Sequence, residues 1–354
     1  MARQATNMVK YIIKRIIIMV PMLFLALIST WLLSHMMGVD PTLNRVGLTD
    51  PDVLELERRR VGYYDPWYIQ IALYLRNFFT GNWGESYILK PGKPVLTLLG
   101  EIFPKTIELM IVPSILSPII GVRLGALAAK HKDKRKDNLI RFIAIIGAAF
   151  PVFWFAAVLQ LGFGVYIPDF TNGQFDLPVM FTNTLGYSYP GPIDGFRTNF
   201  RIIDAIIYND QAFLWDTISH LILPTLCMTI LGISGLTALV RSSMLEVLDQ
   251  DYIRTARAKG VEEDEVNNKH ALRNALLPSS EKIIGGILGA FLGSVFIESV
   301  FVYEGFGYYL LQSVLQGDYL VIAGLTIFTV IFSLTTTLIA DVAYTIIDPR
   351  IVYK

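Results

Sequence analysis

The chain has 354 residues, a formal net charge of zero and 17% charged residues. Its mean hydropathy is +0.49, and a soluble domain carries about 25% charged residues, so the composition indicates a membrane protein and excludes an ordinary soluble one. The balanced charge excludes a global field that would attract nucleic acid. The single cysteine, Cys227, excludes a disulfide framework, and neither it nor the four histidines belong to a metal-site motif.

Six apolar segments are long enough to cross a bilayer, for which roughly 20 apolar residues suffice. They are predicted at residues 12–33, 106–129, 139–167, 217–240, 283–302 and 320–347. The first follows a basic lead-in and is longer than the apolar core of a signal peptide, so we expect an uncleaved transmembrane helix. The second contains Pro113, Pro118 and Arg123 and is expected to be kinked and to face protein in part.

Lysine and arginine predict the orientation of these spans, because they gather on the cytoplasmic side. They are concentrated in the N-terminal lead-in, in residues 130–136, in the loop 241–278 and in the C-terminal tail. Both termini are therefore expected inside. The predicted organisation has three regions: 1–34 with the first span, 35–103 outside the membrane, and 104–354 as a core with five spans, an outer insert at 168–216 and the cytoplasmic loop.

The outer segments carry weaker signals. Asp65-Pro66 predicts the N-cap and first turn of an amphipathic surface helix that ends near Phe79. Acidic residues followed by Arg58–Arg60 indicate a solvated helix just before it. The insert 168–216 is rich in glycine, proline, asparagine and aromatic residues and is predicted to be irregular or short-stranded.

No sequence motif for chemistry is present. The chain contains no phosphate-binding Gly-x-x-x-x-Gly-Lys-Ser/Thr loop, no Gly-x-Ser-x-Gly and no His-Glu-x-x-His. Titratable residues deep in the spans are few, whereas a self-sufficient secondary carrier usually needs them. The sequence therefore offers no such motif for ATP binding, and it counts against a carrier that drives transport by itself.

The loop 241–278 is the most informative part of the chain. Apolar residues at helical spacing predict a helix over Ser242–Ala258, and Gly260 predicts its end as the residue after the C-cap. A second helix is predicted from about Glu262 through Leu272, with Pro278 at its exit into the next span. This pattern favours a helix–turn–helix that docks into a soluble partner; the alternative is a solvated charged loop with incidental helices.

Several blocks carry a family resemblance. QDYIRTARAKG (Gln250–Gly260) followed by HALRNALLP (His270–Pro278) closely resembles the coupling loop of prokaryotic ABC importer permeases, specifically the B subunit of the dipeptide/oligopeptide type. The resemblance covers nearly the whole chain; further blocks are Tyr11–Leu25, Gly62, Asp65-Pro66, Gly81–Ser86, Pro104–Leu109, Phe150–Trp154, Glu298, Phe301, Gly305, Gly307, Asp341, Tyr344 and Asp348–Arg350. The chain departs from the general Glu-Ala-Ala motif with Arg254-Thr255-Ala256, and Glu304 stands where the family often has proline.

The resemblance implies an all-α integral membrane protein with the type I importer permease fold, six transmembrane helices and both termini inside. It implies four kinds of partner: a homologous second permease, two ATPase subunits or domains, an extracytoplasmic solute-binding protein and the lipid bilayer. ATP and Mg²⁺ would be bound by the ATPases, and this chain would hold no cofactor. The implied location is a prokaryotic cell membrane, and the implied solutes are oligopeptides or dipeptides.

Alternatives remain at this point. Oligosaccharides, nickel complexes and opines are imported by similar systems, and an independent channel or carrier, or a membrane scaffold, would belong to other classes.

The sequence also gives two sets of candidate site residues. Residues implied to couple to the ATPases are Asp251, Tyr252, Arg254, Thr255, Ala256, Arg257, Ala258, Lys259, Gly260, His270, Arg273, Asn274 and Pro278.

The second set is Gly285, Gly289 and Gly293, which recur every four residues in the fifth span. Small residues at this spacing let helices approach closely. They indicate tight packing within one subunit or, alternatively, a subunit interface or the wall of a translocation pathway.

Overall fold

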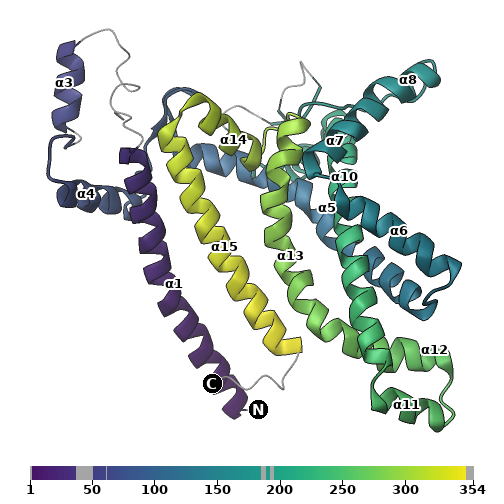
Figure 1. The fold of residues 1–354 in the computed structure, drawn as a ribbon. Coiled ribbons are helices and arrows are strands. Elements are labelled where there is room, and N and C mark those ends of the chain that lie inside the picture. Colours follow the sequence, from purple (N-terminus) through teal and green to yellow (C-terminus); the bar gives the residue numbers. More distant parts are fainter. Residues whose placement is uncertain (1, 37–50, 61, 185–188, 192–194, 348–354) are drawn as a thin grey trace. The chain divides into compact units, whose positions relative to one another are not determined.

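The computed structural model (Figure 1) describes residues 2–36, 51–60, 62–184, 189–191 and 195–347, without the side chains of 2–10, 33–34, 57, 277–282, 284 and 344–347. The family-like residues Asp348–Arg350 lie outside this description. The described chain is almost entirely helical, which confirms the all-α prediction; one pair of two-residue strands is the exception. The chain divides into two compact units, one of residues 1–104 and 305–338, the other of residues 105–304 and 339–354.

The first unit contains one long helix, several short ones and parts of two helices that continue into the second unit. Its elements are α1 (Ala2–Met36), α3 (Pro51–Arg60), α4 (Trp67–Phe79), β1 (Glu85–Ser86), β2 (Lys93–Pro94), the start of α5 (Val95–Lys130), α14 (Phe306–Gln316) and the start of α15 (Tyr319–Ile347). The surface helix α4 packs against α1 and buries none of its residues fully. It begins at Trp67, so Pro66 takes the N-cap position and the predicted Asp65 cap is wrong by one residue.

A buried carboxylate organises the first unit. Asp318 is fully buried and accepts hydrogen bonds from Ser86 Oγ (2.6 Å) and from the backbone N–H groups of Ile88 and Leu89 (both 3.1 Å). These donors neutralise a charge that would otherwise be costly to bury. Asp318 thereby joins the β1–β2 turn to the start of α15.

The second unit is built around α10. Its elements are the rest of α5, α6 (Arg135–Ala149), α7 (Val152–Leu161), the π-helix η1 (Gly162–Tyr166), α8 (Ile167–Phe170), α9 (Arg201–Ile207), α10 (Gln211–Leu248), α11 (Asp251–Ala258), α12 (Glu263–Glu265), the π-helix η2 (Val266–Ala271), α13 (Leu272–Val300) and the end of α15. Helix α10 packs against α6, α7, α9 and α13. Gly121 and Gly125 let α5 approach it, because a Cβ on either would come within 2.8 Å of α10 atoms.

The predicted spans all appear as helices, with one correction. Among the described residues, five helices are long and apolar enough to cross a membrane, at Tyr11–Leu32, Val95–Lys130, Val152–Phe170, Gln211–Leu248 and Tyr319–Ala343, and a shorter apolar helix covers Gly285–Val300. The predicted third span, 139–167, is not one helix: α6 ends at Ala149 and α7 begins at Val152. Pro151 lies between them and disfavours a helical conformation at Phe150, which is extended.

The outer insert 168–216 is more helical than its composition predicts. Its described residues include α8, α9 and the first turn of α10, and no strand occurs among them. Helix α9 buries both of its charged residues, Arg201 and Asp204, and Asp204 accepts hydrogen bonds from Tyr189, Thr198 and Asn199 of the preceding segment. The prediction of an irregular or short-stranded insert is therefore wrong for residues 201–216.

Candidate functional site

The cytoplasmic loop of the sequence prediction folds as a compact hairpin, which we call the coupling hairpin and define as residues 249–275. Its first limb is α11, and its second limb is α12, η2 and the first turn of α13. The predicted helix Ser242–Ala258 is in fact two helices, because α10 continues to Leu248 and Gln250 is extended before α11 begins at Asp251. The second limb continues into α13 without a break at position 278.

The turn between the limbs is a Schellman motif at Gly260. Gly260 has φ +78°, and its N–H donates to Arg257 O (3.0 Å) while the Val261 N–H donates to Ala256 O (3.2 Å). Glycine reaches this left-handed conformation without the steric cost that other residues meet. The prediction of Gly260 as the residue after the C-cap is confirmed.

The limbs enclose a small apolar core. Ile253 of α11 is fully buried against Val266, Ala271 and Ala275 of the second limb, together with Met244 of α10. The half-buried residues Ala256, Val261 and Leu272 extend this core, as does Ala126 of α5. The hairpin is therefore packed directly onto the ends of two predicted spans and is not a solvated loop with incidental helices.

A π-helix sets the register of the second limb. The Leu272 N–H donates to Asn267 O, five residues back, where an α-helix would use the fourth. The interval from Val266 to Ala271 is consequently five residues, and both side chains face the core. An α-helix over the same residues would direct His270 inward in place of Ala271; in the structure His270 is only half-buried.

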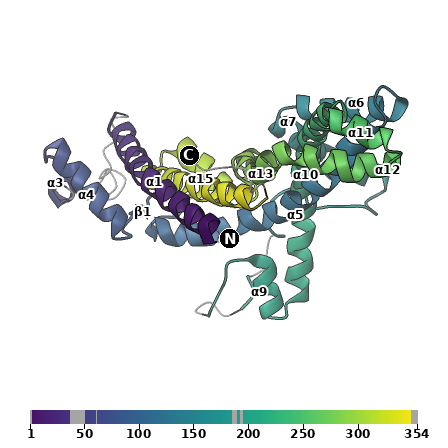
Figure 2. The same ribbon diagram turned by 90° about the horizontal axis from the view of Figure 1, so that it is seen from below.

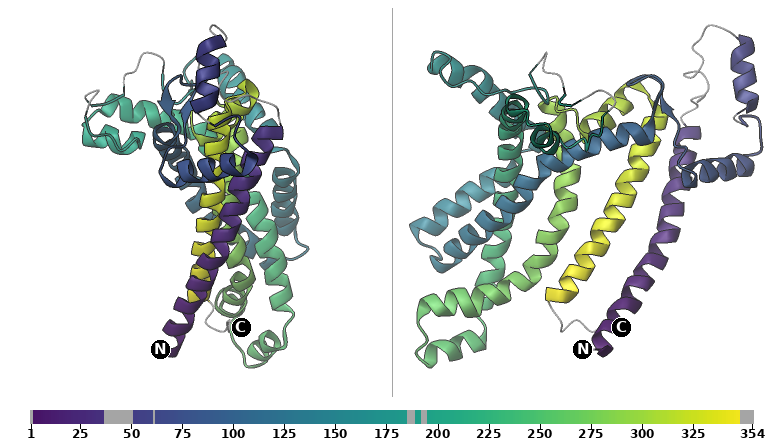
Figure 3. Two further views of the ribbon diagram at one scale, coloured as in Figure 1. Left: turned by 90° about the vertical axis from the view of Figure 1, so that its left-hand side faces the viewer. Right: turned by 180° about the vertical axis from the view of Figure 1, so that it is seen from behind.

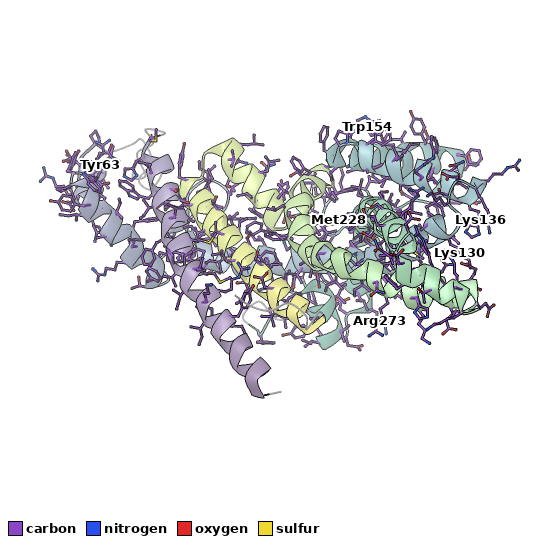
Figure 4. The ribbon with its side chains drawn as sticks, turned by 60° about the horizontal axis from the view of Figure 1, so that its bottom comes forward. Tyr63, Lys130, Lys136, Trp154, Met228 and Arg273 are labelled. Carbon is purple, nitrogen blue, oxygen red and sulfur yellow. The ribbon has the colours of Figure 1, made fainter. Side chains whose placement is uncertain are left out.

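Ion pairs hold the hairpin from outside. Arg257 Nε lies 2.7 Å from Glu263 Oε1 across the turn. Lys130, labelled in Figure 4, lies at the end of α5 and pairs with Asp264 on α12. Exposed pairs of this kind each contribute little, but these two link segments that the apolar core already brings together. Arg257, one of the residues implied to couple to the ATPases, therefore has an ion-pair partner within the chain.

A stronger ion pair lies behind the hairpin. Arg241 of α10 donates from Nε (2.6 Å) and Nη2 (2.8 Å) to the two oxygens of Asp137 at the start of α6. The Asp137 side chain is fully buried. The Arg241 guanidinium holds the pKa of the Asp137 carboxyl below its usual range, aided by the backbone N–H of Asp133. This bidentate pair fixes α10, which leads into the hairpin, to the α5–α6 turn.

The predicted coupling residues divide into outward and inward groups. Those whose side chains or backbone are exposed are Asp251, Tyr252, Arg254, Thr255, Arg257, Ala258, Lys259, Gly260, Arg273 and Asn274. Ala256 and His270 are half-buried, and Ala256 packs on the hairpin core. The side chain of Pro278 lies outside the description. Ala256 therefore serves the inner packing of the hairpin, while Ala258 is the small residue on its outer face.

Several residues that stabilise the coupling hairpin and the helices next to it had no local sequence signal. Two ion pairs, Lys130–Asp264 and Asp137–Arg241, each join residues that are more than 100 positions apart in the sequence. Thr106 and Glu298, each noted only within a family-like block, are joined by a buried hydrogen bond of 2.8 Å. Ile253 and Ala256 did have such a signal, because both occupy the apolar face of the predicted helix Ser242–Ala258.

The glycine stripe of α13 borders open space. A Cβ added at Gly285, Gly289 or Gly293 would meet no described atom within 4 Å. A cavity of about 460 Å³ lies between α5, α10 and α13, and its lining includes Gly289, Gly293 and Met228. These glycines thus make no close packing with the described residues, which favours a subunit interface or a pathway wall over packing within the chain.

Comparisons with known proteins agree with the resemblance. Residues 121–353 match the family model described as the binding-protein-dependent transport system inner membrane component. The chain is 36% identical to the oligopeptide transport system permease protein AppB of Bacillus subtilis, over 98% of this chain and 100% of that one. It is 32% identical to the dipeptide transport system permease protein DppB of Alkalihalophilus pseudofirmus, over 98% and 100%. A probable D,D-dipeptide permease, DdpB of Escherichia coli, is also 32% identical, over 92% of both chains.

Proposed function

Since this chain belongs to the family of binding-protein-dependent transport system inner membrane components, we propose that it is a permease subunit of an ATP-driven importer for oligopeptides or dipeptides. Several relatives that match nearly its full length are named as oligopeptide or dipeptide permeases. The chain supplies half of the path through the membrane and carries out no chemical step. Sugars, nickel complexes and opines are disfavoured as solutes because no observation points to them.

The proposed complex has four kinds of component besides this chain. A homologous second permease completes the pathway, two ATPase subunits or domains bind ATP and Mg²⁺, and an external solute-binding protein delivers the peptide. This chain binds no cofactor of its own. It crosses a prokaryotic cell membrane six times with both termini inside, an orientation that the lysine and arginine distribution supports.

The coupling hairpin is the observation that carries this proposal. An ATPase that closes on ATP moves a permease only through an element that transmits displacement without bending. The hairpin has this property, because Ile253 locks its limbs together and Arg241–Asp137 fixes α10 behind it. Its outer face presents Tyr252, Thr255 and Ala258 to a partner.

The cavity lined by Gly289 and Gly293 is proposed as part of the pathway wall. Its lining is mostly apolar, with Ser114 and Ser117 as its hydroxyl groups. A wall of glycines, serines and uncharged apolar side chains such as Met228 and Leu231 offers no charged group to a solute, which suits passage of peptides that differ in sequence. The outer insert 168–216 is proposed to contact the binding protein or to cover the outer mouth of the pathway.

The coupling proposal is tested with a charge on the outer face of the hairpin. Ala258→Glu should leave the protein folded in the membrane but lower ATPase retention and peptide uptake, because it places a carboxylate in a packed interface. Lys136→Gln is the control: it changes net charge by the same amount at an exposed position outside the hairpin. ATPase co-purification and peptide uptake are measured together. Equal retention and equal uptake in both variants would contradict the proposal.

A further inference from the structure

The start of α10 and the helix before it form a structure that the transport proposal does not use. We call α9 together with residues 211–223 of α10 the lateral arm. Pro224 follows it within α10, and a proline in a helix interior removes a hydrogen bond and kinks the helix. Seen from below, the arm runs away from α6, α7, α11 and α13 (Figure 2), and its sideways course is visible in the left view of Figure 3.

The charged residues of α9 point inward. Asp204 is fully buried and accepts hydrogen bonds from Tyr189 Oη (2.8 Å), Thr198 Oγ1 (2.7 Å) and the Asn199 N–H (3.0 Å). Arg201 is also buried, and its guanidinium carbon lies 4.7 Å from the centre of the Phe213 ring. Both charged residues of α9 are therefore withdrawn from the surroundings.

Apolar side chains occupy the outside of α9. Ile203, Ile206 and Ile207 are exposed, with 63% of Ile206 accessible. A helix that faces water places its charged residues outward and its isoleucines inward. Helix α9 does the reverse, which indicates that its outer face does not meet water.

The opposite side of the arm is apolar as well. Trp215 of α10 is 68% exposed, while Phe213, Thr217 and His220 on the other face of the same helix are buried. A single partner protein would cover one side of the arm and leave the other in water. Lipid covers both. The arm is also continuous with α10, a helix apolar and long enough to cross a membrane, and tryptophan is enriched where such helices reach the bilayer boundary.

We propose that the lateral arm lies in the apolar boundary layer of the bilayer, with the isoleucines of α9 on one side and Trp215 on the other in contact with lipid. The bilayer then holds the arm sideways, and the polar cluster around Asp204 is shielded inside it. This inference needs only that the chain lies in a membrane, so it is independent of the peptide and ATPase assignments.

The test uses the intact transport complex in lipid nanodiscs, with Cys227 replaced by serine and no cysteine in the other subunits. Single cysteines are introduced as Ile206→Cys and Trp215→Cys and labelled with a small fluorescent probe. Spin-labelled phospholipid should quench both probes strongly. Gln174→Cys is the control, since Gln174 is an exposed polar residue of the same insert, and its probe should keep its fluorescence.

Two results would overturn the proposal. In the first, both arm cysteines resist lipid quenching and react with a membrane-impermeant thiol reagent as fast as Gln174→Cys does. In the second, one arm position is quenched while the other cross-links to another subunit, which would make the arm a protein contact. Quenching of both positions with slow reaction toward the impermeant reagent supports it.

Discussion

The coupling hairpin and the lateral arm are two short helical assemblies attached to the same helix, α10, and they are built in opposite ways. In the hairpin, Ile253 and Val266 lie inside and the charged residues Arg254 and Lys259 lie outside. In the arm, Asp204 and Arg201 lie inside and isoleucines lie outside. Side chains sort by the medium around them, so the two patterns indicate water or a hydrated partner at the hairpin and lipid at the arm.

The two opposite patterns also imply that different forces stabilise the hairpin and the arm. The hairpin is held by apolar burial, which operates in water. The arm is surrounded by lipid in our account, where apolar association gains little and hydrogen bonds inside the assembly matter more. Substitutions in the core of the hairpin should therefore destabilise it by removing apolar burial, and substitutions in the arm by removing hydrogen bonds. Comparing the two sets of substitutions tests the account.

The largest expected effect comes from the hairpin core. Ile253→Asp removes a fully buried side chain and buries a carboxylate that has no partner, at a cost of about 4 kcal/mol or more. We expect the hairpin to open locally while the spans stay folded. Hydrogen exchange of residues 251–262 in the free permease should rise strongly.

The neighbouring variant Tyr252→Asp is the matched control, because Tyr252 is exposed on the same helix. Its hydrogen exchange in the free permease should stay near that of the original chain. Equal protection of the hairpin in Ile253→Asp would show that its limbs are not held by the apolar core.

A second comparison concerns the two buried carboxylates. Asp137→Asn leaves the Arg241 guanidinium without its counter-charge and should cost about 3 kcal/mol. Asp204→Asn alters a carboxylate held by neutral donors, Tyr189, Thr198 and Asn199, and should cost about 1–2 kcal/mol. Thermal unfolding of the purified complex would measure both, and a larger loss for Asp204→Asn would contradict this ranking.

The same carboxylates predict a pH dependence. The Arg241 hydrogen bonds lower the pKa of Asp137, and although burial alone would raise the pKa of Asp204, hydrogen bonds from Thr198 keep it below its usual range. A depressed pKa stabilises the fold above the unfolded value, about 3.9, and this contribution is lost as pH falls through the folded value. Stability from these residues should be constant from pH 7 to 5 and fall below about pH 4.

The smallest effect is expected at the hairpin turn. Gly260→Ala places a Cβ on a residue with φ +78° and should destabilise the turn by about 1 kcal/mol. Gly100→Ala is the matched control, because Gly100 is a helical residue of α5 and a Cβ added there would meet no atom within 4 Å. This substitution should be neutral or slightly stabilising. If ATPase stimulation by peptide falls equally in both, the special conformation of Gly260 has no role in coupling.

The sequence predicted the elements of these regions better than their boundaries. Gly260 marked the end of α11 because its conformation depends on local backbone sterics. The break at Gln250 was missed, since apolar residues continue at helical spacing from Leu245 to Ala256. The π-turn at Asn267 was also missed, because its register depends on packing against Ile253 and Met244.

The outer insert 168–216 shows most clearly what could not be predicted from the sequence. Its composition indicated irregular structure, and a helix as short as α9 has no strong pattern of its own. Asp204 accepts a hydrogen bond from Tyr189 Oη, 15 residues away, and Glu108 Oε1, 94 residues away, accepts from the Ile202 N–H at 2.8 Å. Such non-local partners cannot be found from one sequence. In our proposal the exposed isoleucines of the arm face lipid, whereas an exposed residue of a soluble protein faces water.

The central claim is that the outer face of the coupling hairpin contacts an ATPase on the cytoplasmic side. It is tested most directly by Ala258→Cys in the intact complex, with Cys227 replaced by serine, using a short thiol–amine cross-linker and identification of the cross-linked partner by mass spectrometry. Our account predicts a cross-link to an ATPase subunit and no labelling of position 258 by an impermeant reagent added outside intact cells. A cross-link only to the second permease or the binding protein, or labelling from outside, would contradict it.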